Sequence, residues 1–294
     1  MRSQKRVLVI GGDLRYGYTA RALSRHFDTY ALGFTRRVLP FPEVAVLESA
    51  AQGVPVCDAL VLPMPVSDDG VCVNAPLSPQ VLPLHSLVPL VREGGTVFGG
   101  RFGKAQEVFD KAGIRTVDYL QEEALSVANA VPTAEGALQI LLEEMPRTLC
   151  GSRVLVLGFG RIGIRLAHSL HALGARVTVA ARRLSDRTHA EAVGCRAVPT
   201  AGLAGEVGGF DVICNTVPAV LLTREVLSAV SPDALVLDLA SKPGGVDWEA
   251  AKALSVRVVW ALSLPGRTAP VTAGEIIART VTDILTEGGN ADGA

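Results

Sequence analysis

Short apolar runs alternate with stretches of helical periodicity along almost the whole chain. Runs rich in Val, Leu and Ile that are bounded by Gly, Asp or Arg predict strands covered on both faces, as in a parallel sheet. The stretches between them repeat apolar residues at the spacing of one helix face. Alternation of these two patterns predicts an α/β fold.

The pattern forms two sets, and each set predicts one sheet. Strands are predicted in the first half at 5–10, 29–34, 59–62, 96–99 and 114–117, and helices at 14–27, 84–91 and 104–111. Strands are predicted in the second half at 153–157, 176–180, 212–215, 235–238 and 256–261. We therefore predict two Rossmann-like, doubly wound parallel-sheet domains joined by long hinge helices.

The predicted boundaries give a first domain over 1–120, a connecting helix over 121–150, a second domain over 151–265 and a C-terminal helix within 266–294. Pro132 lacks an N–H group, so the connecting helix is predicted to be interrupted at 131–133. A capping box at Thr272 and Glu275 predicts the start of the last helix. Its apolar stripe predicts a return to the first domain, and the residues after Glu287 predict a frayed tail.

A glycine motif follows the first strand of the second domain. Gly158, Gly160 and Gly163 have the spacing G-x-G-x-x-G between a predicted strand and a predicted helix. This context is typical of a dinucleotide site, where glycines permit a tight turn, close approach of a pyrophosphate and close helix packing. The predicted cofactor contacts in this segment are Gly158, Phe159, Gly160, Arg161, Ile162 and Gly163.

The end of the next strand indicates which dinucleotide is bound. NAD enzymes usually place an acidic residue there for the ribose 2′-hydroxyl. Here Ala181, Arg182 and Arg183 follow the strand, and no acidic residue occurs between Gly163 and Asp186. Two guanidinium groups favour a 2′-phosphate, so we predict NADP. The alternative is that both arginines are ordinary solvated loop residues.

Two later loops are expected to pass the ribose and nicotinamide, because they follow strands of the same predicted sheet. The predicted contacts in these loops are Asn215, Thr216, Val217, Pro218, Leu239 and Ala240.

Composition excludes several other classes. The 294 residues carry a net charge of −1, which gives no indication of a nucleic-acid or anionic-membrane partner. The five cysteines are scattered without ligand or disulfide spacing, and we expect them to be reduced in the cytoplasm. His168 and His171 lie one helical turn apart without a third ligand, so we predict no metal site. No apolar run reaches the length of a membrane span.

The first domain begins with a phosphate-loop-like segment over 11–17 in which Asp13 replaces the second glycine. A carboxylate there repels pyrophosphate, so we assign no nucleotide to this domain and expect it to face substrate across a cleft. Asp13 is a candidate substrate residue or the N-cap of the next helix. Arg15 is a candidate for a substrate carboxylate or an exposed surface residue.

Several segments together resemble the dipicolinate synthase A-subunit family, in the right order over essentially the whole chain. The most specific are Asn129-Ala-Val-Pro132-Thr133-Ala-Glu135-Gly136 and Asp238-Leu-Ala-Ser-Lys242-Pro-Gly-Gly245. The others are Ile10-Gly-Gly-Asp13-Leu-Arg15, Leu157-Gly-Phe-Gly-Arg161-Ile-Gly163 and Leu264-Pro-Gly266-Arg-Thr-Ala-Pro270-Val-Thr-Ala-Gly274.

This resemblance implies an enzyme of endospore formation in the mother-cell cytoplasm. It implies NADP-dependent oxidation of dihydrodipicolinate to pyridine-2,6-dicarboxylate, together with a B subunit similar to flavoproteins. We also expect the chain to form a homo-oligomer.

A dicarboxylate substrate needs cations, and removal of a proton needs a base. Lys242 is the first candidate cation, followed by Arg15 and Arg267. Glu135 is the candidate base, with Asn129 and Thr133 beside it as substrate contacts. The alternative for Glu135 is that it caps the restarted helix.

Two other functions fit the same pattern. A D-2-hydroxyacid dehydrogenase has this layout but requires a late catalytic His, and this chain has no His after His189. A non-catalytic NADP-binding subunit that regulates a flavoprotein partner is the second alternative, because binding of a cofactor does not prove turnover.

Overall fold

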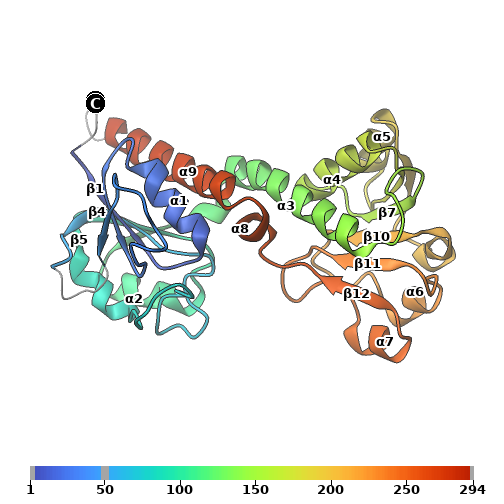
Figure 1. The fold of residues 1–294 in the computed structure, drawn as a ribbon, viewed down its shortest axis with the longest axis horizontal. Helices are drawn as coiled ribbons and strands as arrows, with labels where there is room; N and C mark the ends of the chain where they lie inside the picture. Colours follow the sequence, from blue (N-terminus) through green and yellow to red (C-terminus); the bar gives the residue numbers. More distant parts are fainter. Residues whose placement is uncertain (1–3, 48–52, 292–294) are drawn as a thin grey trace. The chain divides into compact units, whose positions relative to one another are not determined.

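The computed structural model describes residues 4–47 and 53–291. The chain forms two compact units, one of Met1–Asn129 with Ala269–Ala294 and one of Ala130–Thr268 (Figure 1). In the part of the chain that the structure describes, each unit contains a parallel sheet of six strands with helices on both faces. This confirms the predicted fold class.

The first sheet has the strand order β3-β2-β1-β4-β5-β6, the Rossmann order. The four residues from Val7 to Ile10 in the central strand β1 are fully buried, which explains their continuous apolar character. The strands are β1 (Arg6–Ile10), β2 (Asp28–Leu32), β3 (Ala45–Leu47), β4 (Cys57–Val61), β5 (Val91–Gly99) and β6 (Arg115–Asp118).

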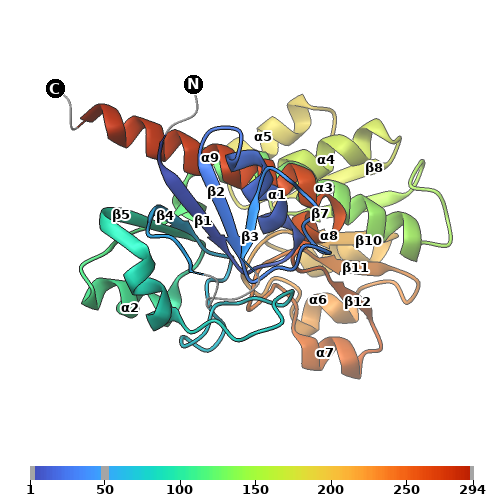
Figure 2. The ribbon, with the colours of Figure 1, turned by 60° about the vertical axis from the view of Figure 1, so that its left-hand side comes forward.

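Helices cover both faces of the first sheet. On one face, α1 (Leu14–Leu23) and α9 (Pro270–Ala291) pack side by side and share a core with the start of α3 (Glu123–Glu144) (Figures 1 and 2). The other face packs against α2 (Gln106–Lys111) and a 3₁₀ segment at Leu84–Leu90. The predicted helix at 84–91 is therefore a 3₁₀ segment, and Val91 already belongs to β5.

The second sheet repeats the same order as β12-β11-β10-β7-β8-β9. Its strands are β7 (Arg153–Leu157), β8 (Arg176–Ala180), β9 (Arg196–Val198), β10 (Val212–Asn215), β11 (Leu235–Asp238) and β12 (Arg257–Trp260). The sequence pattern missed β3 and β9, which are short edge strands of three residues each. Such strands carry too few residues to establish a period.

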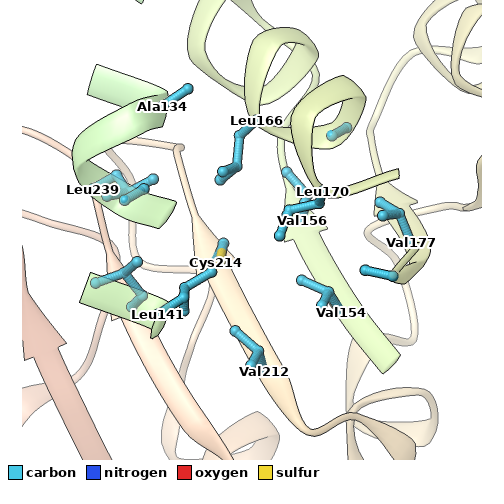
Figure 3. Close-up of a cluster of buried hydrophobic side chains, with 14 of the residues drawn as sticks. Ala134, Leu141, Val154, Val156, Leu166, Leu170, Val177, Val212, Cys214 and Leu239 are labelled. Carbon is cyan, nitrogen blue, oxygen red and sulfur yellow. The ribbon is translucent and has the colours of Figure 1, made fainter. Parts of the chain in front are cut away.

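The second sheet is also covered on both faces. The rest of α3, with α4 (Arg161–Ala172) and α5 (Leu184–Ala192), packs on one face, where Leu141, Leu166 and Val156 of β7 belong to one buried cluster (Figure 3). On the other face lie α6 (Arg224–Ser228) and α7 (Trp248–Ala253). A short helix α8 (Leu264–Thr268) precedes α9.

Three further predictions about helices are wrong. The connecting helix is not interrupted at 131–133, because α3 runs unbroken through Pro132. Its neighbouring residues Ala130 and Ala134 are buried in the cores, and this packing compensates for one missing backbone hydrogen bond. The last helix begins at Pro270, where the missing N–H is harmless, so the proposed capping box lies inside α9. Helix α9 continues to Ala291 in place of a frayed tail, and 292–294 lie outside the described residues.

No helix among the described residues is both long enough and apolar enough to cross a membrane.

Candidate functional site

The loops that follow β7, β8, β10 and β11 meet at one edge of the second sheet. Asn215, the last residue of β10, is paired in register with Leu157 of β7 and with Asp238 of β11. Leu157 is paired in turn with Ala180 of β8. Because all of these strands are parallel, the four predicted cofactor segments lie together at the carboxyl edge. The strand order reverses between β7 and β10, the point where open α/β sheets bind their ligands.

Each of the three glycines in the G-x-G-x-x-G motif occupies its position for a different structural reason. Gly158 has a φ of +90°, and a Cβ there would lie 2.7 Å from the Thr216 hydroxyl oxygen. A Cβ on Gly163 would lie 2.2 Å from the carbonyl oxygen of Gly158, so α4 touches the turn at this point. A Cβ on Gly160 would meet no atom of the described residues within 4 Å. The space in front of Gly160 is therefore open.

This arrangement fits a dinucleotide pyrophosphate. Gly160 is the N-cap of α4, and no side chain in the described part of the chain caps its first turn. The N–H groups of a helix N-terminus and the positive end of the helix dipole favour an anion at this position. The Phe159 side chain, in contrast, is buried against the His189 ring, with centroids 5.4 Å apart. Phe159 therefore has only its main chain to offer a cofactor.

Arg182 and Arg183 stand exposed directly after β8, and Arg183 is the N-cap of α5. Ala181 before them is buried in the core. Arg187 donates from Nη1 to the carbonyl oxygens of Ala181 and Arg182, at 3.0 and 2.9 Å. The Arg187 guanidinium on α5 thus holds the turn in place, and Arg182 and Arg183 project from that turn into solvent.

A buried polar pair joins the ends of β10 and β11. Asn215 and Asp238 are both fully buried, and Asn215 Nδ2 donates to Asp238 Oδ1 at 2.8 Å. The same amide nitrogen donates to the carbonyl oxygen of Val217 at 3.0 Å, and Thr216 Oγ1 donates to that of Leu157 at 2.8 Å. The Asn215 side chain therefore shapes the loop 215–218 from within, as buried polar groups require partners.

Asp238 also organises the loop that carries Lys242. Its carboxylate accepts the N–H groups of Ala240 at 3.1 Å and of Gly245 at 2.9 Å, so the loop is closed at both ends. Trp260 Nε1 donates to the carbonyl oxygen of Ala240 at 3.0 Å. Leu239 and Ala240 are buried, whereas Lys242 is exposed at the tip of the loop.

The predicted base, Glu135, lies on α3 next to the glycine at which α3 touches α8. A Cβ on Gly136 would approach Leu264 Cβ to 2.9 Å, so the two helices touch at this glycine. Glu135 beside it is exposed in the middle of α3, and Arg267 is exposed on α8. The alternative role of Glu135 as the cap of a restarted helix is wrong, because no helix starts there. Thr133 is buried on the same helix, and Asn129 lies one turn earlier, in the first unit.

Asp13 and Arg15 lie in the first unit and bind each other. Asp13 is the N-cap of α1 and accepts a hydrogen bond from the backbone N–H of Arg15 at 3.0 Å. This confirms the N-cap, one of the two roles that the sequence suggested for Asp13. Arg15 donates from Nε and Nη2 to the two carboxylate oxygens, at 2.9 and 2.8 Å. Arg15 is only 4% exposed, so the interpretation as a surface residue is wrong. Burial alone would lower the pKa of Arg15, but its hydrogen bonds to Asp13 leave that pKa above the ordinary value.

The glycine turn of the first unit is covered by the chain itself. Gly12 donates its N–H to the carbonyl oxygen of Asn74 at 2.9 Å, and a Cβ on Gly11 would collide with Val73 and Ala75. The carboxylate of Asp13 occupies the helix N-terminus where a phosphate lies in a dinucleotide domain. The two units thus share a strand order but differ in what their first loop offers a ligand.

Three residues of the site were missed from the sequence. Arg187 follows Arg183 by one helical turn, a spacing that places both on one face of α5. Asp238 is a charged residue at the end of an apolar run, next to the strand that ends in Asn215. Trp260 stacks on Trp248, with ring centroids 5.4 Å apart, and its indole N–H also donates to the carbonyl oxygen of Ala240.

Comparison with known proteins agrees with this geometry. Residues 6–120 match the family model for the N-terminal domain of the dipicolinate synthase A subunit. Residues 128–240 match the NAD-binding domain of D-isomer specific 2-hydroxyacid dehydrogenases. Fold and site therefore define an oxidoreductase with a domain for a nicotinamide dinucleotide.

The relatives define the family more closely. The dipicolinate synthase A subunit of Bacillus subtilis (strain 168) is 30% identical over 287 residues, which cover 96% of each chain. The crystal structure of its counterpart from Bacillus halodurans is 30% identical, covers 97% of this chain and 99% of its own, and has a TM-score of 0.89. The crystal structure of the Bacillus subtilis protein is 29% identical, covers 98% and 97%, and has a TM-score of 0.87. This chain belongs to the dipicolinate synthase A-subunit family, which confirms the resemblance in its sequence motifs.

Proposed function

We propose that this chain oxidises dihydrodipicolinate to dipicolinate with NADP as the acceptor, acting with a flavoprotein B subunit. The observation that carries the proposal is the carboxyl edge of the second sheet, where an open glycine turn adjoins an arginine pair in a chain of this family. Membership of a family of A subunits supports the existence of a partner subunit.

The reaction removes a hydride and a proton from neighbouring atoms of the ring, and the ring becomes aromatic. The nicotinamide of bound NADP supplies the acceptor for the hydride, so that each turnover yields one NADPH and one proton. The protein therefore has to hold the two carboxylates of the ring and to accept the proton.

In this proposal, Lys242 and Arg267 bind substrate carboxylates. Both are exposed cations of the unit that carries the glycine turn. Lys242 stands on a loop that Asp238 and Trp260 hold in place, which limits the entropy that its side chain loses on binding. Arg15 is the third proposed carboxylate ligand, and it remains paired with Asp13, whose carboxylate uses two of its five N–H donors.

Glu135 accepts the proton in this proposal, with Asn129 and Thr133 as substrate contacts on the same helix. Glu135 and Arg267 lie on α3 and α8, which touch at Gly136. A carboxylate exposed to solvent can pass a proton on to water, as repeated turnover requires.

The preference for NADP rests on Arg182 and Arg183. They follow β8 at the place where NAD enzymes carry an acid, and Arg187 holds their turn. Two guanidinium groups bind a 2′-phosphate by charge-assisted hydrogen bonds, each contributing about 1.5–3 kcal/mol. The mother-cell cytoplasm of a sporulating bacterium and a homo-oligomeric state complete the proposal.

The test is NADPH formation from freshly generated dihydrodipicolinate, followed by absorbance with the purified chain alone and with its flavoprotein partner. We expect turnover with NADP and little with NAD. The double variant R182A/R183A should lose about 10–100-fold in kcat/KM for NADP and little for NAD. R165A removes an exposed arginine on α4 and serves as the matched control.

Turnover only in the presence of the partner would make this chain half of an active unit. Binding of NADP without turnover under either condition would contradict the proposal and support the non-catalytic regulatory role. Equal turnover with NAD and NADP in the unaltered chain would contradict the role of the arginine pair alone.

A further inference from the structure

The opposite, amino edge of the second sheet carries a cluster of arginines that the nucleotide site does not use. Arg153, Arg176 and Arg196 are the first residues of the neighbouring strands β7, β8 and β9. They line one pocket of about 550 Å³. This volume lies within the range of small-molecule sites.

The positive charge of this pocket is only partly neutralised. Arg196 pairs with Glu206 at 3.0 Å, and Arg153 lies 3.8 Å from Asp211. Asp211 already accepts from Arg147 at 3.1 Å and from the Arg153 N–H at 2.8 Å. One carboxylate therefore serves two guanidinium groups.

Arg176 has no side-chain partner among the residues that the structure describes, although it lies between the two paired arginines at the start of the middle strand. The exposed His171 of α4 lines the same pocket, and its ring lies against Gly194. The residues that line the pocket thus carry three guanidinium groups, those of Arg153, Arg176 and Arg196, and one carboxylate, that of Glu206, which leaves two positive charges. A pocket with this excess favours a dianion.

A neighbouring pocket of about 450 Å³ shows the contrast. It is lined by Arg147, Arg153 and Arg257 together with Asp211 and Asp233. Arg257 is in addition bound to Glu144. Its lining has one positive charge beyond its two carboxylates, and Glu144 pairs with Arg257, so this pocket favours an anion less than the first one does.

We propose that the pocket formed by Arg153, Arg176, Arg196 and His171 is a second anion site, which binds a small dianion at the edge of the sheet opposite the nucleotide. The pocket wall also includes the ring of Phe210 and the aliphatic Ala175 and Val177, so an organic dianion gains apolar contacts there in addition to its ion pairs. Phosphate monoesters and dicarboxylates share this chemistry. The site does not depend on the proposed reaction, because β7 and β8 separate it from the glycine turn by about 17 Å of strand.

The test is calorimetric titration of the full-length chain, saturated with nicotinamide dinucleotide to fill the other phosphate site. Inorganic phosphate and pyridine-2,6-dicarboxylate are the two probes, titrated separately at constant ionic strength, and chloride is the monovalent reference. We expect at least one dianion to bind, and R176E to weaken that binding about tenfold or more. The probe that depends more strongly on Arg176 identifies the source of the dianion.

R224E is the matched control, because Arg224 is an exposed arginine of the same unit on α6, away from the pocket. R176Q provides a milder change if the charge reversal disturbs the fold. Unchanged dinucleotide affinity shows that a variant is folded. Equal binding of both dianions by the unaltered chain, R176Q and R176E would overturn the proposal, as would binding that chloride reproduces.

Discussion

Arg187 illustrates at the scale of single residues how one side chain can act through its neighbours. In our proposal Arg187 does not contact the cofactor itself. It donates hydrogen bonds to the carbonyl oxygens of Ala181 and Arg182. A turn that is held in this way presents Arg182 and Arg183 in one orientation, so less conformational entropy is lost when a 2′-phosphate binds.

Replacing Arg187 by Ala should therefore weaken NADP binding about three- to tenfold and leave NAD binding almost unchanged. R187K should recover part of the loss, because an ammonium group can reach one carbonyl but not both with the same geometry. Fluorescence titration with both dinucleotides measures the two affinities. An equal loss for NADP and NAD would show that Arg187 stabilises the domain in general.

Tyr16 and Tyr119 form a buried hydroxyl pair in the first unit. Their oxygens are 2.7 Å apart, and Tyr119 donates to the carbonyl oxygen of Leu62 at 3.0 Å. Burial raises the pKa of Tyr16 to about 12, against a lowering effect of the nearby Arg15 charge. Burial and the neighbouring Tyr16 hydroxyl also raise the pKa of Tyr119 well above its ordinary value.

This pair predicts a loss of stability in alkaline solution. In the unfolded chain tyrosine ionises near pH ~10, whereas both buried hydroxyls stay protonated in the folded chain. The stabilisation is therefore complete below pH ~10 and is lost as the pH rises toward the folded pKa of about 12. Urea unfolding at several pH values should show a smaller alkaline loss for Y16F/Y119F, by about 2–3 kcal/mol or more. Identical pH profiles for the two proteins would contradict this assignment.

At the scale of elements, the strand–turn–helix unit around Gly160 separates folding from binding. Gly163 is required because α4 touches the turn, and a Cβ at this position would lie 2.2 Å from the carbonyl oxygen of Gly158. Gly160 has a φ of −86°, which any residue adopts, and it faces open space. Helix packing therefore requires a glycine at position 163, whereas the proposed cofactor requires one at position 160.

We expect G163A to lower the free energy of unfolding of the second unit by about 1–3 kcal/mol, because the helix has to move away from the turn. G160A should leave stability almost unchanged but weaken dinucleotide binding about tenfold or more, since its methyl group enters the proposed pyrophosphate space. Thermal unfolding and dinucleotide titration of both variants measure the two effects. Unchanged dinucleotide affinity in G160A would contradict the proposed cradle.

At the scale of the whole molecule, the first unit is completed by the end of the chain. Helix α9 lies along α1 so closely that a Cβ on Gly274 would approach the carbonyl oxygen of Arg15 to 2.5 Å. Ile276, Ile277, Val281 and Leu285 of α9 are buried in the core of this unit. At about 1.5–3 kcal/mol each, their burial is comparable with the total stability of a domain.

A chain that ends at Ala269 should therefore lose the folded first unit while the second unit keeps its sheet. We expect loss of one of two unfolding transitions in calorimetry and rapid proteolysis within 4–129. A chain that ends at Glu287 is the control, because it retains all four buried residues. A native first transition in the shorter chain would show that α9 contributes little to the core.

Short segments of the sequence were enough to predict most of the strands and the glycine turn. Four of the six strands of the second sheet were predicted with their observed bounds, because buried parallel strands read as continuous apolar runs between polar ends. The glycine spacing predicted the turn, and the family motifs marked Lys242, Glu135 and the loop of Asp238. These signals depend on few residues that lie close together in the chain.

Only the tertiary structure decided how distant residues combine. It shows that Arg15 is buried against Asp13, and that Asn215 and Asp238 form one buried pair across two strands. It carries α3 through Pro132 and starts α9 at Pro270, because packing on both cores outweighs a local helix-breaking preference. It also gathers Arg153, Arg176 and Arg196 at one edge, since three parallel strands begin there. Local pattern sets which segments form, whereas contacts between segments set which side chains meet.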